Sequence, residues 1–385
     1  MPDGVDDLDG EALEIATRYL LDGWTLKQLA GVFHRSPATL HRRLARWLND
    51  GRFELVDTMA AEVTPRVVGM DERLSEALSG RTSIWRAHVA VVEGVGDAYS
   101  DDYLIPDGSP EANRAFEAHD RLHQALGQAA STYFATRLRR GITIGVSSGR
   151  GVGFLVMGLA ELAQERPSFL RGYQSIRIES LCGGARVGAW AVPTVRALDA
   201  DENVFQLSSI LGVPRSNITF MRGWISGERR PDINNDLPHK PPLDLALAGL
   251  EVLNTRHQFF LHHDQNVQLG AIAQYIETLK ELQAGDPTLL DSVAGIAHQF
   301  FVTGAREYPE RLSEAVDGIN REVLVVPPER VRKAEEVIMV TGGAQKLNAL
   351  VDLLDGRCPG APVDLDNLTL ITDAWTAERA LKRLG

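Results

Sequence analysis

The sequence has little cysteine: Cys182 and Cys358 are the only two among its 385 residues. Two thiols cannot build the disulfide framework of small secreted domains, and their scarcity fits a reducing cytosol. Long apolar segments are missing as well, since an uncharged run such as Ser292–Ala305 is too short to span a bilayer. The first residues carry no basic, apolar leader. We therefore expect a cytoplasmic protein that does not associate with membranes.

Net positive charge is also lacking, because the formal charge at pH 7 is −12. This balance argues against a protein that coats nucleic acid over its whole surface. The charge is unevenly distributed, however. Gly23–Arg52 contains six basic residues and a single acid, Asp50. A basic block of this kind is compatible with local binding of nucleic acid.

The basic block has the pattern of two short helices joined by a turn. From Leu26 to Phe33, apolar residues recur at i, i+3, i+4 and i+7. Ser36 followed by Pro37 is typical of the start of a helix, and a second apolar stripe begins at Leu40. The second helix is basic outside and apolar inside. The pattern predicts a helix-turn-helix unit whose second helix enters the major groove of DNA.

Base edges and phosphates are expected to be contacted by different residues of this unit. The first turns of a recognition helix reach base edges, whereas peripheral cations position the protein on the phosphates. The predicted base-reading residues are Ser36, Ala38, Thr39, Arg42 and Arg43, and the predicted phosphate contacts are Lys27, Arg35 and Arg46. The alternatives are a solvated helical bundle without a ligand, or one that binds a protein partner instead of double-stranded operator DNA.

A doubly wound, mostly parallel α/β domain is predicted for most of the remaining chain. Strands that alternate with helices are typical of this class. The predicted long helix is Ser109–Arg139, and the predicted strands are 85–92, Ile142–Val146, Ile176–Leu181, Ile218–Met221, Val323–Val326, Val337–Val340 and Leu368–Ile371. The expected organisation is a helix-turn-helix domain over 1–56, a linker over 57–84 and the α/β domain over 85–385. The stretch 222–242 is predicted to be a long surface loop.

Glycine-rich turns follow several of these runs, at the carboxyl ends of strands where parallel sheets hold their ligands. Small residues there allow backbone amides to face an anion at a helix N-terminus. The first turn contains Ser147, Ser148, Gly149, Arg150 and Gly151, and the second contains Gly183 and Gly184. A purely structural glycine turn is the alternative for each. The G-x-G-x-G spacing of the first turn differs from the dinucleotide-binding fingerprint.

Four further polar residues stand beside such turns or runs. Gln345 and Lys346 follow the run Val337–Val340. A lysine in the first turn of a helix opposes the helix dipole, so it indicates a bound anion unless it simply extends into solvent. Asp373 follows the last strand and is either a helix N-cap or a ligand for sugar hydroxyls. Asp244 is a lone acid among apolar residues. It is either a capping aspartate or an acceptor of hydrogen bonds from a polyol.

No metal or cofactor is expected from the sequence. His257, His262, His263 and Asp264 invite a metal interpretation, but their spacing is not a standard ligand spacing. Cys182 is expected to be a small apolar filler and not a nucleophile.

These motifs together resemble the SorC/DeoR-type sugar-binding transcriptional regulators. In the head, the resemblance rests on Asp22–Ala30 and Ser36–Leu40. In the larger domain, it rests on Gly145–Arg150, Asp244–Gly249, Gly342–Lys346 and Thr372–Ala377. The last two segments are the more specific, because their order and their spacing to the C-terminus also fit.

The resemblance implies a Rossmann-like fold similar to that of sugar-phosphate isomerases. It implies a dimer or tetramer that binds an operator under the control of a small carbohydrate, typically a phosphorylated sugar. By matched positions, the turn 147–151 and Lys346 would hold the phosphate, and Asp244 would approach the sugar. Gly151 departs from the family, which often has threonine there. The alternative function is a sugar-phosphate isomerase or deaminase with an appended helical head.

Overall fold

The chain falls into two compact units, which we describe from a computed structural model. The described part of the first unit lies within Met1–Glu62, and that of the second within Val63–Gly385. The residues that the structure describes are 15, 26–37, 39–40, 66–99, 110–165, 172–182, 200–221, 242–253, 278, 281–282, 285, 292–297, 299–304, 310–322 and 325–385.

The N-terminal unit contains the helix α2 (Leu26–Val32) and the start of a following helix. The Leu29 and Leu40 side chains are fully buried, as the apolar stripes predict. The Ser36 hydroxyl accepts a hydrogen bond from the backbone N–H of Thr39 at 3.1 Å. Ser36 is therefore the N-cap of this following helix, which confirms the prediction for this position.

The second unit is built around an eight-stranded sheet with the strand order β1-β2-β11-β10-β6-β3-β4-β5. All its neighbouring strands are parallel except β1 and β2. The strands are β1 (Arg66–Met70), β2 (Arg86–Glu93), β3 (Thr143–Val146), β4 (Arg177–Ser180), β5 (Ile218–Thr219), β6 (Leu245–Ala248), β10 (Glu336–Val340) and β11 (Leu368–Asp373).

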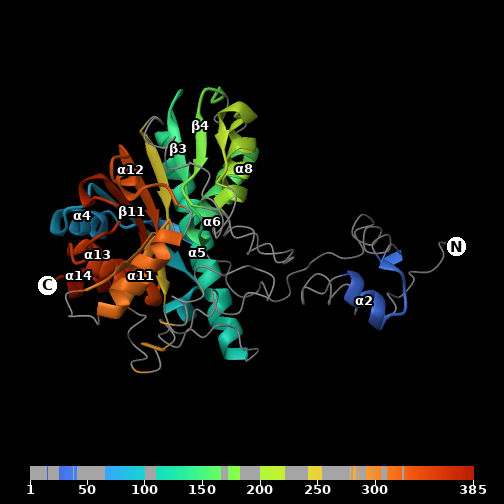
Figure 1. Cartoon of the computed structure of the whole chain (residues 1–385), viewed down its shortest axis with the longest axis horizontal. Helices are drawn as coiled ribbons and strands as arrows, with labels where there is room; N and C mark the ends of the chain where they lie inside the picture. Colours follow the sequence, from blue (N-terminus) through green and yellow to red (C-terminus); the bar gives the residue numbers. More distant parts are fainter. Residues whose placement is uncertain are drawn as a thin grey trace. The chain divides into compact units, whose positions relative to one another are not determined.

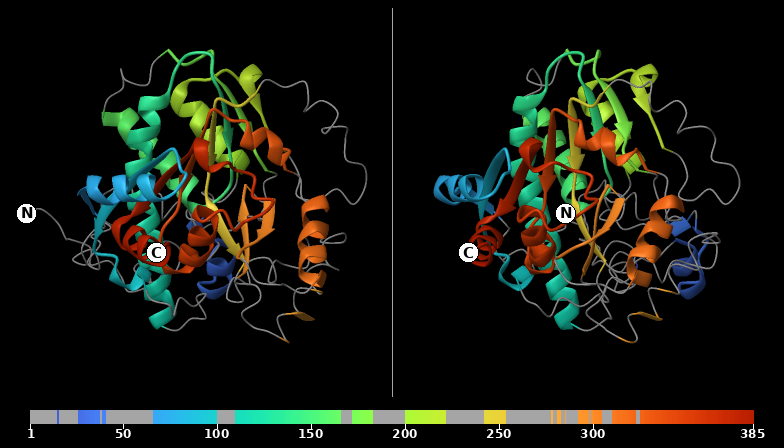
Figure 2. Two further views of the ribbon diagram at one scale, coloured as in Figure 1. Left: turned by 90° about the vertical axis from the view of Figure 1, so that its left-hand side faces the viewer. Right: turned by 60° about the vertical axis from the view of Figure 1, so that its left-hand side comes forward.

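Helices cover both faces of this sheet, which gives a three-layer α/β arrangement (Figures 1 and 2). One face packs against α5 (Pro110–Arg137), α6 (Arg150–Glu165) and α8 (Ala200–Leu211). The other face packs against α4 (Glu72–Arg81), α12 (Pro328–Arg332), α13 (Leu347–Leu354) and α14 (Ala374–Arg383). The short 3-10 turns are η1 (Gly96–Tyr99), η2 (Arg215–Asn217), η6 (Ala344–Lys346) and η7 (Leu365–Asn367).

A small antiparallel sheet accompanies the large one. Its strands are β7 (Leu250–Leu253), β8 (Val293–Ile296) and β9 (Gln299–Val302), in that order. The helix α11 (Glu310–Glu322) is fastened to β9 through Asn320, whose amide accepts from the Phe300 N–H at 2.8 Å and donates to its carbonyl at 2.7 Å. This sheet was not predicted, because its strands are short and interrupted by small residues.

The fold class is confirmed, and two local predictions need correction. Arg66–Arg81, assigned from its mixed composition to the linker, forms β1 and α4 of the sheet unit. An edge strand and the helix beside it bury few side chains, so their apolar pattern is weak. The predicted strand Val323–Val326 is represented within the described residues only by an isolated bridge between Val325 and Cys182. Among the described helices, none is both long enough and apolar enough to cross a membrane.

Candidate functional site

The large sheet has a topological switch point between β3 and β6. From β3 the chain continues outward to β4 and β5, and from β6 it continues in the other direction to β10 and β11. Ligands of open parallel sheets bind outside the carboxyl ends of the strands at such a point. The turn after β3, the turn after β10 and the residue Asp373 at the end of β11 all lie at this carboxyl edge. We call this region the carboxyl-edge site.

The turn after β3 has a buried polar backbone that leads into a helix. Ser147 and Ser148 are almost completely buried, and the Ser147 N–H donates to the Leu247 carbonyl at 2.9 Å. Gly149 has a φ of 109°, a conformation that favours glycine. The 16-residue helix α6 begins at the next residue, Arg150. Its N-terminal amides and its dipole favour an anion at this position.

The helix α5 contributes residues to the site that were not predicted from the sequence. The Arg150 guanidinium lies 2.8 Å from a carboxylate oxygen of Asp120 and 3.4 Å from Nδ1 of His119. His123, one helical turn further on, contacts His119 with ring centroids 4.3 Å apart and ring planes tilted by 42°. The only sequence signal for these site residues was a group of polar residues within the apolar stripe that contains Leu122. Such a group is equally typical of a helix face exposed to solvent.

The turn after β10 packs tightly against both α5 and Asp373. A Cβ on Gly342 would lie 2.3 Å from the Asp373 carboxylate and 2.8 Å from the Leu126 side chain, so only glycine fits. Gly343 has a φ of 89°, and its N–H donates to the Thr376 hydroxyl at 2.9 Å. The glycine pair therefore brings the start of the following turn close to α5.

Asp373 is the N-cap of α14. Its carboxylate accepts from the backbone N–H of Thr376 at 2.9 Å and from the Thr376 hydroxyl at 2.7 Å. It is fully buried, and burial raises the pKa of its carboxyl group despite these hydrogen bonds. Burial and the nearby Asp373 carboxylate raise the pKa of the Tyr99 hydroxyl. Asp373 was predicted to be either a helix N-cap or a ligand for sugar hydroxyls, and these hydrogen bonds are those of an N-cap.

Lys346 ends the 3-10 turn η6 and immediately precedes α13. Its side chain is half-buried, and its charge acts on the ring of His123 together with the charge of Arg150. The neighbouring Gln345 places its amide nitrogen in a buried position without a hydrogen-bond partner among the described residues. The carboxyl-edge site thus combines two cations with a helix N-terminus.

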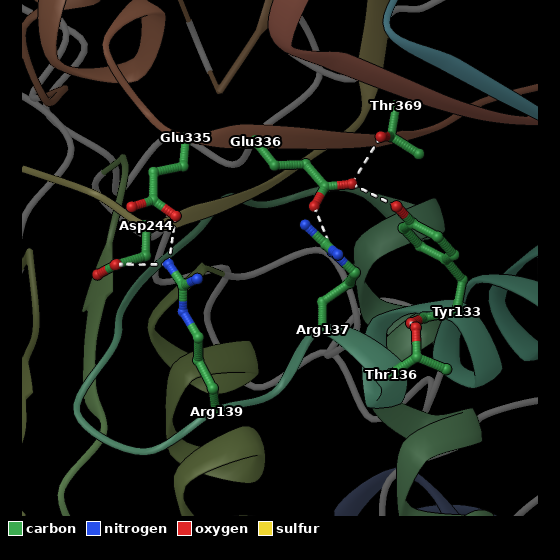
Figure 3. A network of polar contacts seen from close by, with 8 residues as sticks. All are labelled: Tyr133, Thr136, Arg137, Arg139, Asp244, Glu335, Glu336 and Thr369. Carbon is green, nitrogen blue, oxygen red and sulfur yellow. Dashed lines mark hydrogen bonds and ion pairs between the residues drawn. The ribbon is translucent and has the colours of Figure 1, made fainter.

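Asp244 does not belong to this site. It directly precedes β6, whose first residue pairs with Ile144 of the parallel strand β3, so it lies at the amino edge of the sheet. Its carboxylate accepts from the Thr143 N–H at 2.7 Å and contacts the Arg139 guanidinium at 3.2 Å (Figure 3). This corrects the expectation that Asp244 approaches the sugar. The segment Asp244–Gly249 matches the family motif in sequence, but the direction of β6 places Asp244 at the opposite edge of the sheet.

Gly151 also has a structural explanation. A Cβ at this position would lie 2.6 Å from the backbone carbonyl oxygen of Val340. The residue therefore faces the sheet and allows α6 to approach the end of β10. The family that the sequence resembles often has threonine here, but the side chain of threonine would collide with the Val340 carbonyl oxygen.

The remaining predicted residues are only partly placed by the structure. Lys27, Arg35 and Ser36 are exposed, and Thr39 is half-buried, as expected for the outer surface of a helix pair. Six further predicted site residues lie outside the described residues, and so do the four residues of the metal interpretation. They are Ala38, Arg42, Arg43, Arg46, Gly183 and Gly184, and His257, His262, His263 and Asp264.

His123 predicts that stability depends on pH. Burial, followed by the charge of Lys346, lowers the pKa of this fully buried imidazole well below 6.5. As the pH falls below about 6.5, the His123 imidazole binds a proton in the unfolded chain but not in the folded chain. The free energy of unfolding then decreases by up to about 1.4 kcal/mol per pH unit. The variant His123→Phe should lose less stability between pH 7.5 and pH 5 in urea titrations. Equal losses in both proteins would contradict the assignment.

Searches against known proteins found similarity in solved structures alone. No protein-family model and no curated protein matches the chain. The full-length sorbitol operon regulator SorC from Klebsiella pneumoniae is 18% identical, with 96% of this chain and 97% of that chain covered and a TM-score of 0.50. A putative sugar-binding domain of a transcriptional repressor from Vibrio fischeri is 13% identical, with 82% and 99% covered and a TM-score of 0.52.

A third solved structure, a DeoR family transcriptional regulator from Listeria monocytogenes, is 15% identical. It is covered to 98%, this chain is covered to 80%, and the TM-score is 0.51. These likenesses establish the fold: the chain has the architecture found in SorC- and DeoR-type regulators. The predicted resemblance to SorC/DeoR-type regulators is therefore confirmed for the fold.

Proposed function

We propose that the chain is a transcriptional regulator of the cytoplasm. Its helix-turn-helix head binds operator DNA, and its α/β domain binds a phosphorylated sugar that controls this binding. The proposal rests on two features that occur in one chain. The first is an N-capped helix pair with exposed cations, and the second is a sheet whose carboxyl edge carries a cationic site at a helix N-terminus. The fold of SorC- and DeoR-type regulators supports the same function.

The carboxyl-edge site supports the choice of a phosphorylated effector. Arg150 and Lys346 provide positive charge, and the N-terminus of α6 provides backbone amides. Arg150 is held by Asp120 in this structure. A phosphate bound there would compete with Asp120 for the guanidinium, which binds phosphate in a bidentate fashion. Effector binding would thereby change the contacts between α5 and α6.

Regulation requires a coupling free energy between the two sites. A dimer or tetramer would place two heads on a pseudo-palindromic operator, since the two-fold symmetry of a protein is mirrored in its half-sites. The effector then shifts the operator affinity through its different affinity for the two states of the protein.

The alternative of an isomerase or deaminase has less support. Such chemistry needs a general base within hydrogen-bond reach of the substrate. Neither of the two candidate carboxylates is placed for this role, because Asp244 lies at the amino edge and Asp373 is a buried helix cap. Incubation of the protein with sugar phosphates tests this alternative, and turnover would favour it.

The first experiment is a titration of the full-length protein with DNA fragments from upstream of its own gene. Fluorescence anisotropy across a salt series should show saturable, sequence-dependent binding. Neutralisation of about five phosphates gives a log–log salt slope near −4 to −5. Sugar phosphates are then added to the complex, and one of them should release or tighten the DNA. Binding without salt dependence would instead favour a protein-interaction module.

Lys346→Ala should remove most of the thermal stabilisation that the effector gives to the wild-type protein. A ligand at about 100 times its dissociation constant stabilises the folded state by about 2.7 kcal/mol, and loss of the phosphate contact removes most of this. Differential scanning fluorimetry with the effector identified above measures the change. Lys382→Ala, at an exposed position of α14, is the matched control and should keep the full stabilisation. An undiminished shift in Lys346→Ala contradicts the phosphate assignment.

A further inference from the structure

The buried histidine pair of α5 has a proton arrangement that the contacts define. The Nδ1 atom of His123 lies 2.9 Å from the backbone carbonyl oxygen of His119. A carbonyl oxygen only accepts hydrogen bonds, so Nδ1 carries the proton and donates it. In the neutral imidazole the other nitrogen, Nε2, then has a lone pair and acts as an acceptor.

Nε2 of His123 is an acceptor without a donor. The His123 side chain has no exposed surface, and Nε2 has no hydrogen-bond partner in the part of the chain that the structure describes. A buried polar atom in this state costs free energy until a partner arrives. Burial and the charges of Lys346 and Arg150 keep the ring neutral, so the lone pair is available at physiological pH.

The surroundings of this nitrogen restrict the kind of group that can pair with it. Lys346 and Arg150 attract an anion to the same neighbourhood. The dianion of a phosphate monoester has only acceptor oxygens, so it pairs with the two cations and not with Nε2. A hydroxyl group has the proton that Nε2 requires. A ligand that satisfies all three residues therefore contains both an anionic group and a hydroxyl group.

We propose that His123 is a specificity-determining residue of the carboxyl-edge site, which accepts a hydrogen bond from an effector hydroxyl through Nε2. The proposal rests on the proposed function, and it adds the residue that distinguishes a sugar phosphate from a phosphate monoester without hydroxyl groups.

The test compares two probes on the full-length protein by isothermal titration calorimetry. The probes are methyl phosphate, whose dianion has no hydroxyl group, and the tightest binder from a panel of hexose and pentose phosphates. His123→Phe keeps a ring of similar size but has no acceptor. We expect its affinity for the sugar phosphate to fall roughly 5- to 100-fold, the cost of one lost buried hydrogen bond, with the affinity for methyl phosphate unaffected. Lys346→Ala should weaken both probes.

Equal losses for the two probes in His123→Phe, or no loss for either, overturn the role of His123 while the proposed function stands. If no panel member binds the wild-type protein, the proposed function fails, and the inference fails with it. A second measurement keeps the inference testable if His123→Phe does not fold. In the wild-type protein labelled with ¹⁵N at histidine, the Nε2 resonance should be that of an unprotonated nitrogen. It should move with the sugar phosphate and not with methyl phosphate, and a protonated Nε2 at pH 7.5 overturns the inference.

Discussion

Glu336→Ala is expected to lower the free energy of unfolding by about 3 kcal/mol, the largest effect on stability that we predict. Glu336 begins β10 at the amino edge of the sheet and is fully buried. Its carboxylate accepts hydrogen bonds of 2.6 Å from the Tyr133 hydroxyl, the Thr369 hydroxyl and Nε of Arg137 (Figure 3). Its removal leaves the buried Thr369 hydroxyl and the half-buried Tyr133 hydroxyl without this acceptor. About a third of the Arg137 side chain is exposed, so water compensates part of its loss.

The adjacent residue supplies the control for this prediction. Glu335 contacts Arg139, and the two side chains are 62% and 58% exposed. An exposed ion pair contributes at most about 1 kcal/mol, so Glu335→Ala should have little effect. Urea titrations followed by fluorescence should show a lower midpoint for Glu336→Ala with an unchanged slope. Similar midpoints for the two variants would show that the buried network does not stabilise the sheet unit.

The double substitution Arg42→Ala with Arg43→Ala should weaken operator binding by at least about 100-fold. Each arginine that reads a base pair contributes about 1–3 kcal/mol, and one that contacts a phosphate contributes to the salt dependence. The effector should bind the variant as it binds the wild type, since the substitutions lie in the head. Anisotropy with the operator fragment and calorimetry with the effector measure the two properties.

A matched control separates recognition from net charge. Arg140→Ala with Lys382→Ala also removes two positive charges, from exposed positions of the sheet unit. It should retain the operator affinity within a small factor. Unchanged affinity in the Arg42 and Arg43 variant would mean that the recognition helix lies elsewhere in the chain. Equal loss in both double variants would mean that only the overall charge matters.

Several elements could be predicted from the sequence because local interactions determine them. Ser36 before Pro37 predicted a helix start, and its hydroxyl caps that helix. The glycines at 149 and 343 predicted turns at the carboxyl ends of strands, and both adopt positive φ angles. Short apolar runs such as Val337–Val340 predicted the central strands, which are buried on both faces. Capping, backbone conformation and hydrophobic runs are properties of neighbours in the sequence, so they are visible in it.

The composition of the candidate site was decided by the tertiary structure. The motif around Asp244 predicted a sugar contact, but the direction of β6 carries this acid to the amino edge. His119 and His123 had no distinguishing pattern, and they became site residues because α5 crosses the sheet and passes the Gly342–Gly343 turn. Glu179 and Arg330, an ion pair buried between β4 and α12, are 151 positions apart and share no local signal.

The sequence by itself therefore determined the class of fold, the helix start at Ser36 and the glycine turns at the carboxyl ends of strands. The tertiary structure alone decided which side chains meet there. The physical reason is that strand direction and helix crossing depend on packing between distant segments, and a single sequence records each segment without its partner.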